Sequence, residues 1–461
     1  MAEETYDLIV VGAGQGGDPL ARSFAKEGKT VALIERLAVG GTCVNRGCTP
    51  TKTMAASARV AYLARRGADY GVGTGPVTVD MAKVRDRKRG IVDEFREGTE
   101  KKIEAIDGLT LIYGDAKFTG PKTVEVAPNG GGETRTLTAP LIVINTGARA
   151  TVPPVEGLDS VPFLDSTSIM EVAEVPEHLV VLGGSYIALE FGQMFRRFGS
   201  EVTILEKSEQ LLGHEDPDVA EAMRKILTED GLKIHTGVSA KRVAKSADGS
   251  VVVTLEDGTE ITGSHLLLAV GRTPNSDGLG LDAAGVETDD KGLIVVSDTL
   301  ETTQPGVYVI GDIKGGPQFT HISYDDFRIL EANLLKDGHR TTKDRQVPYT
   351  VFTDPQLGRV GMSETEAKEA GKNIKVAMLP MTEVARALET AETRGLMKAV
   401  VDADSGQILG AAVIGVEGGE TMAVLEVAML GKLPYTALRD ATLAHPTWAE
   451  SLNNLFMTLD K

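Results

Sequence analysis

The chain has 461 residues, 42% of them hydrophobic and 5% aromatic, and its 52 glycines suit α/β domains with tight turns better than a β-sandwich. Its formal net charge of -18 argues against nucleic acid or an anionic membrane as the main partner. The start has no basic leader, no apolar run approaches the roughly 20 residues that span a bilayer, and two cysteines form no disulfide scaffold, so we expect a cytoplasmic protein.

A strand, a glycine-rich turn and a helix open the chain. Apolar residues 6–11 run into Gly12, and Gly14 and Gly17 complete a GxGxxG pattern before a helical stretch and a second strand that ends in Glu35. Glycines in this pattern permit a tight turn and a close approach to a pyrophosphate, and the acid accepts hydrogen bonds from ribose hydroxyls. The segment therefore predicts a dinucleotide site at the start of the helix.

Both cysteines of the chain lie in the next segment, as Cys43 and Cys48. Positions five apart in an ideal helix rise about 7.5 Å, which exceeds the reach of an unstrained disulfide, so we expect a distorted first turn that Gly47 permits. A helix N-terminus and Lys52 both lower the pKa of a nearby thiol. In a reducing compartment such a close pair is catalytic or metal-binding, and nothing nearby supplies the about four ligands that zinc requires, so we expect no metal site.

The strand, glycine turn and helix pattern occurs a second time. Apolar residues 179–182 precede Gly183, a helix follows, and the next strand ends in Glu206 at the distance found in the first unit. Two such units predict two dinucleotides. Glu206 repels a 2′-phosphate and favours NADH, whereas Ala188 and Lys207 leave NADPH open as the alternative donor.

The remaining segments connect and follow these two units. Residues 123–126 and 134–138 predict a β-hairpin, and a later apolar strand ends in Gly311 and Asp312, where α/β folds place ligand contacts. From about residue 348 onward, strands and amphipathic helices occur without glycine-rich phosphate loops, and one apolar helix is centred on residues 422–430. This last part predicts a docking or dimer domain.

Near the C-terminus, His445 precedes Glu450 by five residues. A histidine that a carboxylate orients is the usual general acid or base at neutral pH, so this pair is a candidate for proton transfer. The other histidines, for example His178, His235 and His339, lack such a partner pattern and are interpreted as ordinary.

Taken together, the segment 40–52, the two glycine turns, the Gly-Asp strand end and the His-Glu pair resemble the class I pyridine nucleotide-disulfide oxidoreductases, which include dihydrolipoyl dehydrogenase, glutathione reductase and mercuric reductase. The resemblance runs from Tyr6 to the C-terminal end. Within the family, residues 318–323 and 347–349 are most similar to bacterial mercuric-reductase-like and reactive-chlorine-resistance flavoproteins.

The resemblance implies an α/β fold with two dinucleotide-binding (Rossmann-like) domains, one for FAD and one for NAD(P), and a C-terminal α+β dimerisation domain. The expected boundaries are 1–149 and 275–346 for a discontinuous FAD domain, 150–274 for the NAD(P)H domain, and 347–461 for the dimerisation domain.

The resemblance also implies roles for single residues. Cys43 is the interchange thiol that meets the acceptor, and Cys48 is the thiol that touches the flavin in a charge-transfer complex. Lys52 and Glu190 form an ion pair beside the reactive flavin nitrogen, and Tyr186 covers the nicotinamide pocket. The expected cofactor contacts are Gly12, Gly14, Gly17, Glu35, Gly41, Thr42, Lys52, Ala116, Thr146, Gly147, Gly311, Asp312, Gly183, Ser185, Tyr186, Ile187, Glu206 and Gly271.

These expectations define a function. Hydride passes from NADH to FAD, electrons reach the Cys43/Cys48 pair, and the dithiol reduces an external acceptor such as mercuric ion, a disulfide or a quinone. Dihydrolipoyl dehydrogenase is the alternative, and a flavin-bound redox sensor without turnover is a remote one. In the homodimer that the resemblance implies, His445 and Glu450 of one subunit face Cys43 of the partner subunit. Because the further C-terminal cysteine pair of mercury specialists is missing, we expect modest turnover of mercuric ion.

Overall fold

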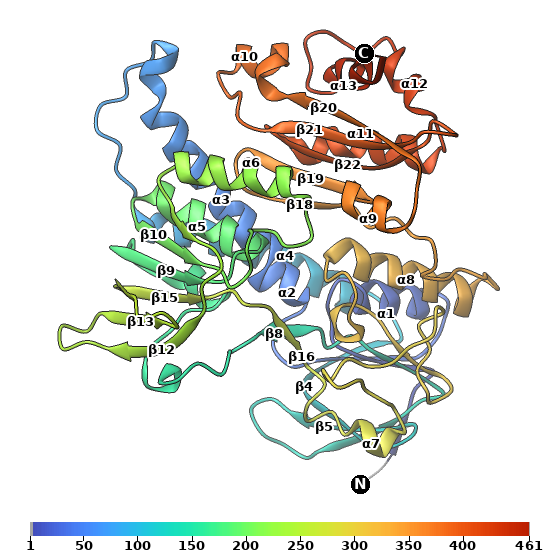
Figure 1. Cartoon of the computed structure of the whole chain (residues 1–461). Helices are drawn as coiled ribbons and strands as arrows, with labels where there is room; N and C mark the ends of the chain where they lie inside the picture. The colour runs from blue at the N-terminus through green and yellow to red at the C-terminus, as the bar shows by residue number, and fades with distance from the viewer. Residues whose placement is uncertain (1–2, 461) are drawn as a thin grey trace. The chain divides into compact units, whose positions relative to one another are not determined.

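A computed structural model describes residues 3–460, and in it the chain forms two compact units (Figure 1). The first unit comprises Met1–Thr53, Arg85–Thr151 and Gly271–Arg345, and the second comprises Met54–Val84, Val152–Val270 and Gln346–Lys461. The predicted three-domain division stays a prediction. The compact units group residues 54–84 with the second unit, whereas the sequence analysis placed them in the FAD domain.

The first unit is built on an eight-stranded sheet with the order β1-β6-β5-β4-β3-β2-β7-β17. Strands β2 and β7 are short and completely apolar, and β3 is apolar up to its last residue, Glu35, which is typical of parallel strands covered on both faces. Alternate residues of β2 accordingly belong to two different hydrophobic clusters, one on each face of the sheet. The strands are β1 (Glu3–Thr5), β2 (Leu8–Val11), β3 (Val31–Glu35), β4 (Leu109–Gly120), β5 (Thr123–Pro128), β6 (Arg135–Thr138), β7 (Leu141–Ile144) and β17 (Val307–Val309).

Strand β4 joins two parts of this sheet. Its first half pairs parallel to β3, and its second half pairs antiparallel to β5. The predicted hairpin is confirmed, because β5 and β6 pair antiparallel around a turn that contains three consecutive glycines with positive φ. A separate two-stranded ribbon, β8 (Ala148–Ala150) with β16 (Arg272–Pro274), forms where the chain leaves and re-enters this unit.

Helices α1 and α8 contact each other in the first unit, and α1 also packs on β2 and β3. Helices α3 and α4 each continue from one compact unit into the other. The helices with residues in this unit are α1 (Gly17–Lys26), α2 (Gly41–Arg46), α3 (Cys48–Arg65), α4 (Met81–Glu104), α7 (Leu281–Ala284) and α8 (Thr320–Leu335).

The second unit contains a parallel sheet with the order β11-β10-β9-β15, which confirms the second predicted strand, glycine turn and helix pattern. Helix α5 packs on β9 and β10, and a three-stranded antiparallel sheet, β12-β13-β14, accompanies them. These elements are β9 (His178–Leu182), α5 (Tyr186–Phe198), β10 (Glu201–Leu205), α6 (Pro217–Glu229), β11 (Lys233–His235), β12 (Ala240–Lys245), β13 (Val251–Leu255), β14 (Glu260–Gly263) and β15 (His265–Leu268).

The C-terminal part of the second unit is a five-stranded antiparallel sheet with the order β18-β19-β22-β21-β20, and α11 packs against β19 and β22. The predicted apolar helix is confirmed as α11. The elements are β18 (Tyr349–Val351), β19 (Gln356–Gly361), α9 (Glu364–Glu369), β20 (Ile374–Pro380), α10 (Ala385–Glu389), β21 (Leu396–Asp402), β22 (Ile408–Gly415), α11 (Gly418–Leu430), α12 (Tyr435–Arg439) and α13 (Ser451–Met457).

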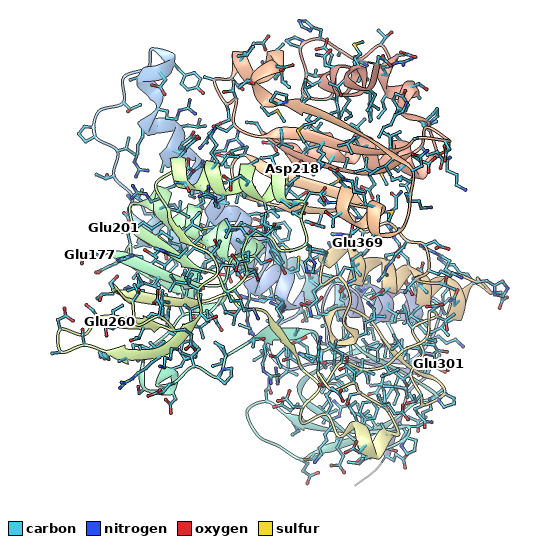
Figure 2. The ribbon with its side chains drawn as sticks, viewed as in Figure 1. Glu177, Glu201, Asp218, Glu260, Glu301 and Glu369 are labelled. Atoms are coloured by element: carbon cyan, nitrogen blue, oxygen red, sulfur yellow. The ribbon has the colours of Figure 1, made fainter. Side chains whose placement is uncertain are left out.

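Carboxylates account for the negative charge of the surface. Figure 2 labels several of them on separate elements, and Glu177, Glu201, Glu260 and Glu369 are all exposed. Exposed carboxylates such as these repel a polyanion, in keeping with the formal net charge of -18.

Candidate active site

The first glycine turn is packed closely against backbone atoms and against the side chain of Asn145. Gly12 has a φ of 104°, and a Cβ atom there would lie 2.3 Å from the carbonyl oxygen of Asn145. A Cβ on Gly17 would lie 2.1 Å from the carbonyl oxygen of Gly12, and one on Gly41 would lie 2.8 Å from Cα of Gly14. Only glycine fits at these positions, so the start of α1 presents bare backbone N–H groups, as a pyrophosphate requires.

Glu35 is held beside this turn at the end of β3. Its Oε2 accepts a hydrogen bond from the N–H of Ala13 at 2.9 Å, and its Oε1 accepts one from the N–H of Leu37 at 2.7 Å. A carboxylate has further acceptor capacity beyond two bonds. The structure therefore brings Glu35 to the turn, and its contact with ribose hydroxyls stays a prediction.

Asp312 lies at the end of the same sheet, directly after β17. Burial raises the pKa of its carboxyl group, and the positive charges of Arg272 and Lys314 oppose that effect. Arg272 Nε lies 3.7 Å from Asp312 Oδ2, and this buried nitrogen has no hydrogen-bond partner among residues 3–460. A buried donor beside a buried carboxylate suits a hydroxyl-rich ligand that can satisfy both.

The remaining first-unit positions predicted to contact a cofactor lie on strands and connections of that unit. Thr146 Oγ1 donates to the carbonyl of Asn275 at 3.1 Å, and Asn275 Nδ2 donates back to the carbonyl of Thr146 at 2.9 Å. Gly147 follows with a φ of 67° and open space around it. Ala116 is half-buried on β4, and Gly271 is exposed before β16. Their contacts with a cofactor stay predictions.

FAD fits the residues of the first unit. The glycine turn offers the backbone cradle that a Cβ atom would fill, Glu35 is fixed beside it, and Asp312 with Arg272 supplies polar groups at the neighbouring strand end. These groups match a dinucleotide in kind: N–H donors for a pyrophosphate and carboxylates for hydroxyls.

The cysteines lie on two different helices. Cys43 belongs to α2, Cys48 is the first residue of α3, and Gly47 between them has a φ of -133° and a ψ of -114°, which interrupts the helix. The predicted distortion is therefore confirmed as a complete break. Cys43 is half-buried and Cys48 is exposed.

Hydrogen bonding to Cys48 raises the pKa of Cys43, and burial raises it further. Lys52 and Thr320 lower the pKa of Cys43, as the sequence analysis expected for Lys52, but their effects are smaller. Two adjacent thiolates would repel each other, so the second proton of the dithiol is harder to remove than the first.

Thr320, the first residue of α8, was missed by sequence analysis as a contact of the thiol pair. Its Oγ1 lies 3.3 Å from Sγ of Cys48. Thr320 lies within the segment 318–323 that carried the family resemblance. The sequence therefore drew attention to this segment, but it assigned no contact with the cysteines to Thr320. Asn145 was also missed: it precedes Thr146, and its Nδ2 donates to the carbonyl of Gly12 at 3.1 Å.

The second glycine turn repeats the construction of the first. Gly183 has a φ of 109°, and a Cβ atom there would lie 2.3 Å from the carbonyl oxygen of Ala269, as at Gly12. Ser185 is exposed immediately before α5, and Tyr186 and Ile187 are half-buried in its first turn. The start of α5 therefore offers a second dinucleotide site of the same kind.

Glu206 lies beside this second turn, directly after β10. A Cβ atom on Gly184 would lie 2.8 Å from Cβ of Glu206, and Glu206 Oε1 accepts the N–H of Ser208 at 2.7 Å. The carboxylate is thus positioned at the turn and held by the following backbone.

Lys52 and Glu190 lie in different compact units, so the ion pair that the resemblance implies stays a prediction. Lys52 is half-buried on α3. Glu190 is 5% exposed on α5, and its Oε1 accepts the N–H of Phe352 at 2.9 Å.

His445 and Glu450 form a direct contact within the second unit. Nδ1 of the imidazole lies 2.9 Å from Oε2 of the carboxylate, and 68% of the histidine side chain is exposed. Thr447 Oγ1 accepts the N–H of Glu450 at 3.1 Å and closes the turn between them. The predicted pairing of these two side chains is confirmed, and their approach to Cys43 of the partner subunit stays a prediction.

Between residues 3 and 460, no group of three or more His, Cys, Asp or Glu side chains is arranged to hold a metal ion. In the same part of the chain, no helix is both long and apolar enough to cross a membrane.

Comparisons with known proteins extend over nearly the whole chain. A family model for pyridine nucleotide-disulphide oxidoreductases matches residues 6–326, and the model for the dimerisation domain of these enzymes matches residues 347–456. A mercuric reductase from Staphylococcus aureus is 36% identical over 460 residues, which are 99% of this chain and 83% of the relative. A dihydrolipoyl dehydrogenase from Haloferax volcanii is 35% identical over 452 residues, 97% of this chain and 94% of the relative.

A third relative is also known as a solved structure. The probable pyridine nucleotide-disulfide oxidoreductase RclA of Escherichia coli K12 is 38% identical over 456 residues, 98% of each chain. The structure of this HOCl-induced flavoprotein disulfide reductase matches with a TM-score of 0.90 at 37% identity and covers 98% of this chain and 99% of that one. Its Cu(II) complex matches with a TM-score of 0.91 at 36% identity, over 99% and 100%.

The predicted α/β fold and the family resemblance are confirmed. The chain belongs to the pyridine nucleotide-disulfide oxidoreductases, enzymes that depend on FAD and take their electrons from NAD(P)H.

Proposed function

We propose that this enzyme transfers two electrons from NADH to the Cys43/Cys48 pair and from there to an external acceptor. The observation that carries the proposal is the thiol pair itself, placed across the break at Gly47 with Cys48 at the N-terminus of α3. Bound FAD supplies the chemistry between the two, because it accepts hydride and delivers electrons to a disulfide.

The chain's own residues bind, orient and move protons in this proposal. Glu35 and the first glycine turn hold the adenosine diphosphate part of FAD, and Asp312 holds the polyol. Cys43 retains the proton of the reduced pair, because hydrogen bonding to Cys48 and burial raise its pKa. His445, oriented by Glu450, then carries protons to and from the acceptor.

For the nicotinamide donor we propose NADH rather than NADPH. Glu206 places a negative charge beside the second glycine turn, where a 2′-phosphate would be repelled and a free ribose diol is accepted. The next residue, Lys207, carries a positive charge that attracts a 2′-phosphate, so slow turnover with NADPH stays the alternative.

For the acceptor we propose a small thiol-reactive species, a metal ion, disulfide or quinone, as in mercuric-reductase-like flavoproteins. Relatives are named mercuric reductase, and the Escherichia coli RclA structure is a Cu(II) complex. Mercuric ion itself should be turned over modestly, because the chain has two cysteines in all and none near its C-terminus.

Dihydrolipoyl dehydrogenase is the second candidate. Glu206 and the His445/Glu450 pair both favour it, and relatives with that name are about 35% identical. Turnover of dihydrolipoamide with NAD⁺ that exceeds turnover with every other acceptor would select this candidate. A redox sensor would instead be reduced once by NADH and would not be reoxidised by any acceptor.

We further propose that the enzyme acts as a cytoplasmic homodimer. The C-terminal part matches a dimerisation domain, and α11 together with the turn after it exposes three large apolar side chains, Val427, Leu430 and Leu433. Exposed apolar side chains clustered in this way are typical of an interface. The cytoplasm is the proposed location because a reducing compartment supplies the nicotinamide donor and keeps the two cysteines from being locked in a permanent disulfide.

One set of assays tests the proposal. NADH oxidation is followed with disulfides, quinones, cupric ion and mercuric ion for the wild type, Cys43→Ser and Cys48→Ser. Both variants should lose turnover with disulfide acceptors while still reducing an artificial one-electron dye, which serves as the internal control because it bypasses the thiols. Full disulfide turnover in both variants would show that the cysteines are not on the electron path.

A further inference from the structure

The backbone corner that carries Asp312 is unusually constrained. Gly311 has a φ of 76°, a conformation that favours glycine. A Cβ atom there would lie 2.8 Å from Oγ of Ser323 and 3.0 Å from Oδ1 of Asn145. The side chains of Ser323 on α8 and of Asn145 after β7 therefore pack against Gly311 and leave no room for a larger residue at this position.

Asp326 lies directly behind this corner, on α8, and is fully buried at 0% exposure. Its Oδ2 accepts the N–H of Gly311 at 2.9 Å and lies 3.1 Å from Nζ of Lys314. Its Oδ1 accepts a hydrogen bond from Nη1 of Arg345 at 2.7 Å. The carboxylate thus holds the residue before Asp312 and the side chain two residues after it.

The groups that contact the carboxylate of Asp326, namely the N–H of Gly311 and the side chains of Lys314 and Arg345, are all hydrogen-bond donors. An ionised carboxylate accepts on both oxygens, whereas an amide of the same size must turn its NH₂ group toward either Arg345 or the Gly311 and Lys314 donors. Lys314 and Arg345 are themselves 6% and 15% exposed at their side chains, so loss of their common partner leaves two cations poorly solvated. The arrangement therefore requires Asp at position 326.

We propose that Asp326 is a positioning residue for FAD: it fixes the Gly311-Asp312 corner from both sides and thereby sets the affinity of the enzyme for its flavin. This inference rests on the proposed role of Asp312 toward FAD. Asp326 itself is fully buried and acts through the corner. The assignment gives a function to an acid that lies among the apolar positions of α8.

The neighbouring Asp325 provides a matched control. It carries the same charge on the same helix, and it pairs with Arg340 at 2.9 Å and with Arg345 at 3.6 Å, but it is 22% exposed at its side chain. Asp325→Asn therefore changes the charge and removes one partner of Arg345, but it leaves the contacts of Asp326 with Gly311, Lys314 and Arg345 in place.

The experiment measures the FAD dissociation constant of refolded apoprotein by quenching of flavin fluorescence, together with the thermal melting of the same apoproteins. We expect Asp326→Asn to weaken FAD binding by about tenfold or more, because buried donors are left unpaired at the corner, and Asp325→Asn to weaken it by less than about twofold. An Asp326→Asn protein that binds FAD within twofold of the wild type overturns the proposal. So does an Asp325→Asn protein that is weakened as much.

A second variant covers the case in which Asp326→Asn does not fold. Lys314→Met keeps the bond from Gly311 to Asp326 but removes the contact of Lys314 with Asp326, together with a positive charge near Asp312, so FAD binding should weaken by about threefold or more. Unchanged FAD binding by this variant overturns the proposal. Asp312→Ala separates the proposed role of Asp312 in FAD binding from the positioning role of Asp326. If Asp312→Ala leaves the FAD affinity unchanged, the proposed FAD site is wrong. If Asp312→Ala binds FAD weakly while Asp326→Asn binds it normally, only the role of Asp326 is rejected.

Discussion

Nδ1 of His445 lies 2.9 Å from Oε2 of Glu450, so the carboxylate occupies one ring nitrogen and leaves Nε2 to exchange protons. The contact orients an imidazole that is otherwise largely exposed. Such an orientation is what a general acid or base needs, because it fixes the tautomer and the direction of the reactive nitrogen.

His445→Ala should therefore lower turnover with a disulfide acceptor by about 10²- to 10⁴-fold, the usual contribution of a general acid or base. Reduction of the bound flavin by NADH, measured by stopped-flow absorbance, should change little, because that step precedes the acceptor. The matched control is His339→Ala, which removes an exposed histidine that has no carboxylate partner pattern. Equal losses in the two variants would contradict a catalytic role for His445.

The same variant also tests whether the site is shared between subunits. Mixing inactive Cys43→Ser chains with inactive His445→Ala chains should restore up to about a quarter of wild-type activity after subunit exchange, since half the dimers are mixed and each has one intact site. Absence of recovery despite exchange, verified by mass spectrometry, would place Cys43 and His445 of one chain in the same site.

Glu206 should determine the choice of nicotinamide. We expect kcat/KM to be higher with NADH than with NADPH, and Glu206→Gln to narrow this ratio by about tenfold, because the repulsion of a 2′-phosphate is removed. Glu209→Gln is the control, since Glu209 is an exposed acid three residues farther along the same loop. If the ratio does not change in Glu206→Gln, this carboxylate does not meet the ribose.

Asp216 should make the second unit sensitive to acid. Burial alone would raise the pKa of this carboxyl group, but hydrogen bonds from the Thr365 and Glu364 N–H groups and from Lys398 outweigh burial and lower the pKa to about 2. A pKa that is lower in the folded state than in the unfolded state stabilises the fold above the unfolded value of 3.8, and this stabilisation is lost as the pH falls toward 2.

Asp216→Asn should therefore lower the free energy of unfolding at pH 7 by about 2 kcal/mol, the equivalent of a shift of nearly two pKa units. The difference between variant and wild type should shrink from pH 4 downward and vanish near pH 2, as measured by denaturant unfolding across that range. The control is Asp159→Asn, which removes an exposed carboxylate of the same unit. A difference that stays constant down to pH 2 would rule out this linkage.

Local features of the fold could be predicted from the sequence because they depend on neighbouring residues. The helix after the second glycine turn ends at Phe198 as its apolar pattern indicated, and the hairpin around three consecutive glycines formed as its composition indicated. Gly12 and Gly183 also behave alike, since each follows a buried strand and meets a carbonyl oxygen of the adjacent one.

Features that depend on distant segments could not be predicted. The pKa of Cys43 is raised because Cys48 returns to it across the break at Gly47, an effect opposite to that expected from Lys52 alone. The corner at Gly311 is fixed by Asp326 on α8 and through it by Arg345, and no local pattern connects these positions. Such contacts arise only when the tertiary fold brings separate elements together.

The ribbon formed by β8 and β16 has a consequence for how this chain can be rearranged. Thr151 donates its N–H to the carbonyl of Gly271 at 3.0 Å, so the 119-residue segment 152–270 leaves and rejoins the first unit at adjacent backbone positions. Topologically, that whole segment is the loop of a β-hairpin. Removal of this segment would leave every strand of the eight-stranded sheet intact, but it would expose the apolar residues of 54–84 and 346–461 that share a hydrophobic cluster with it.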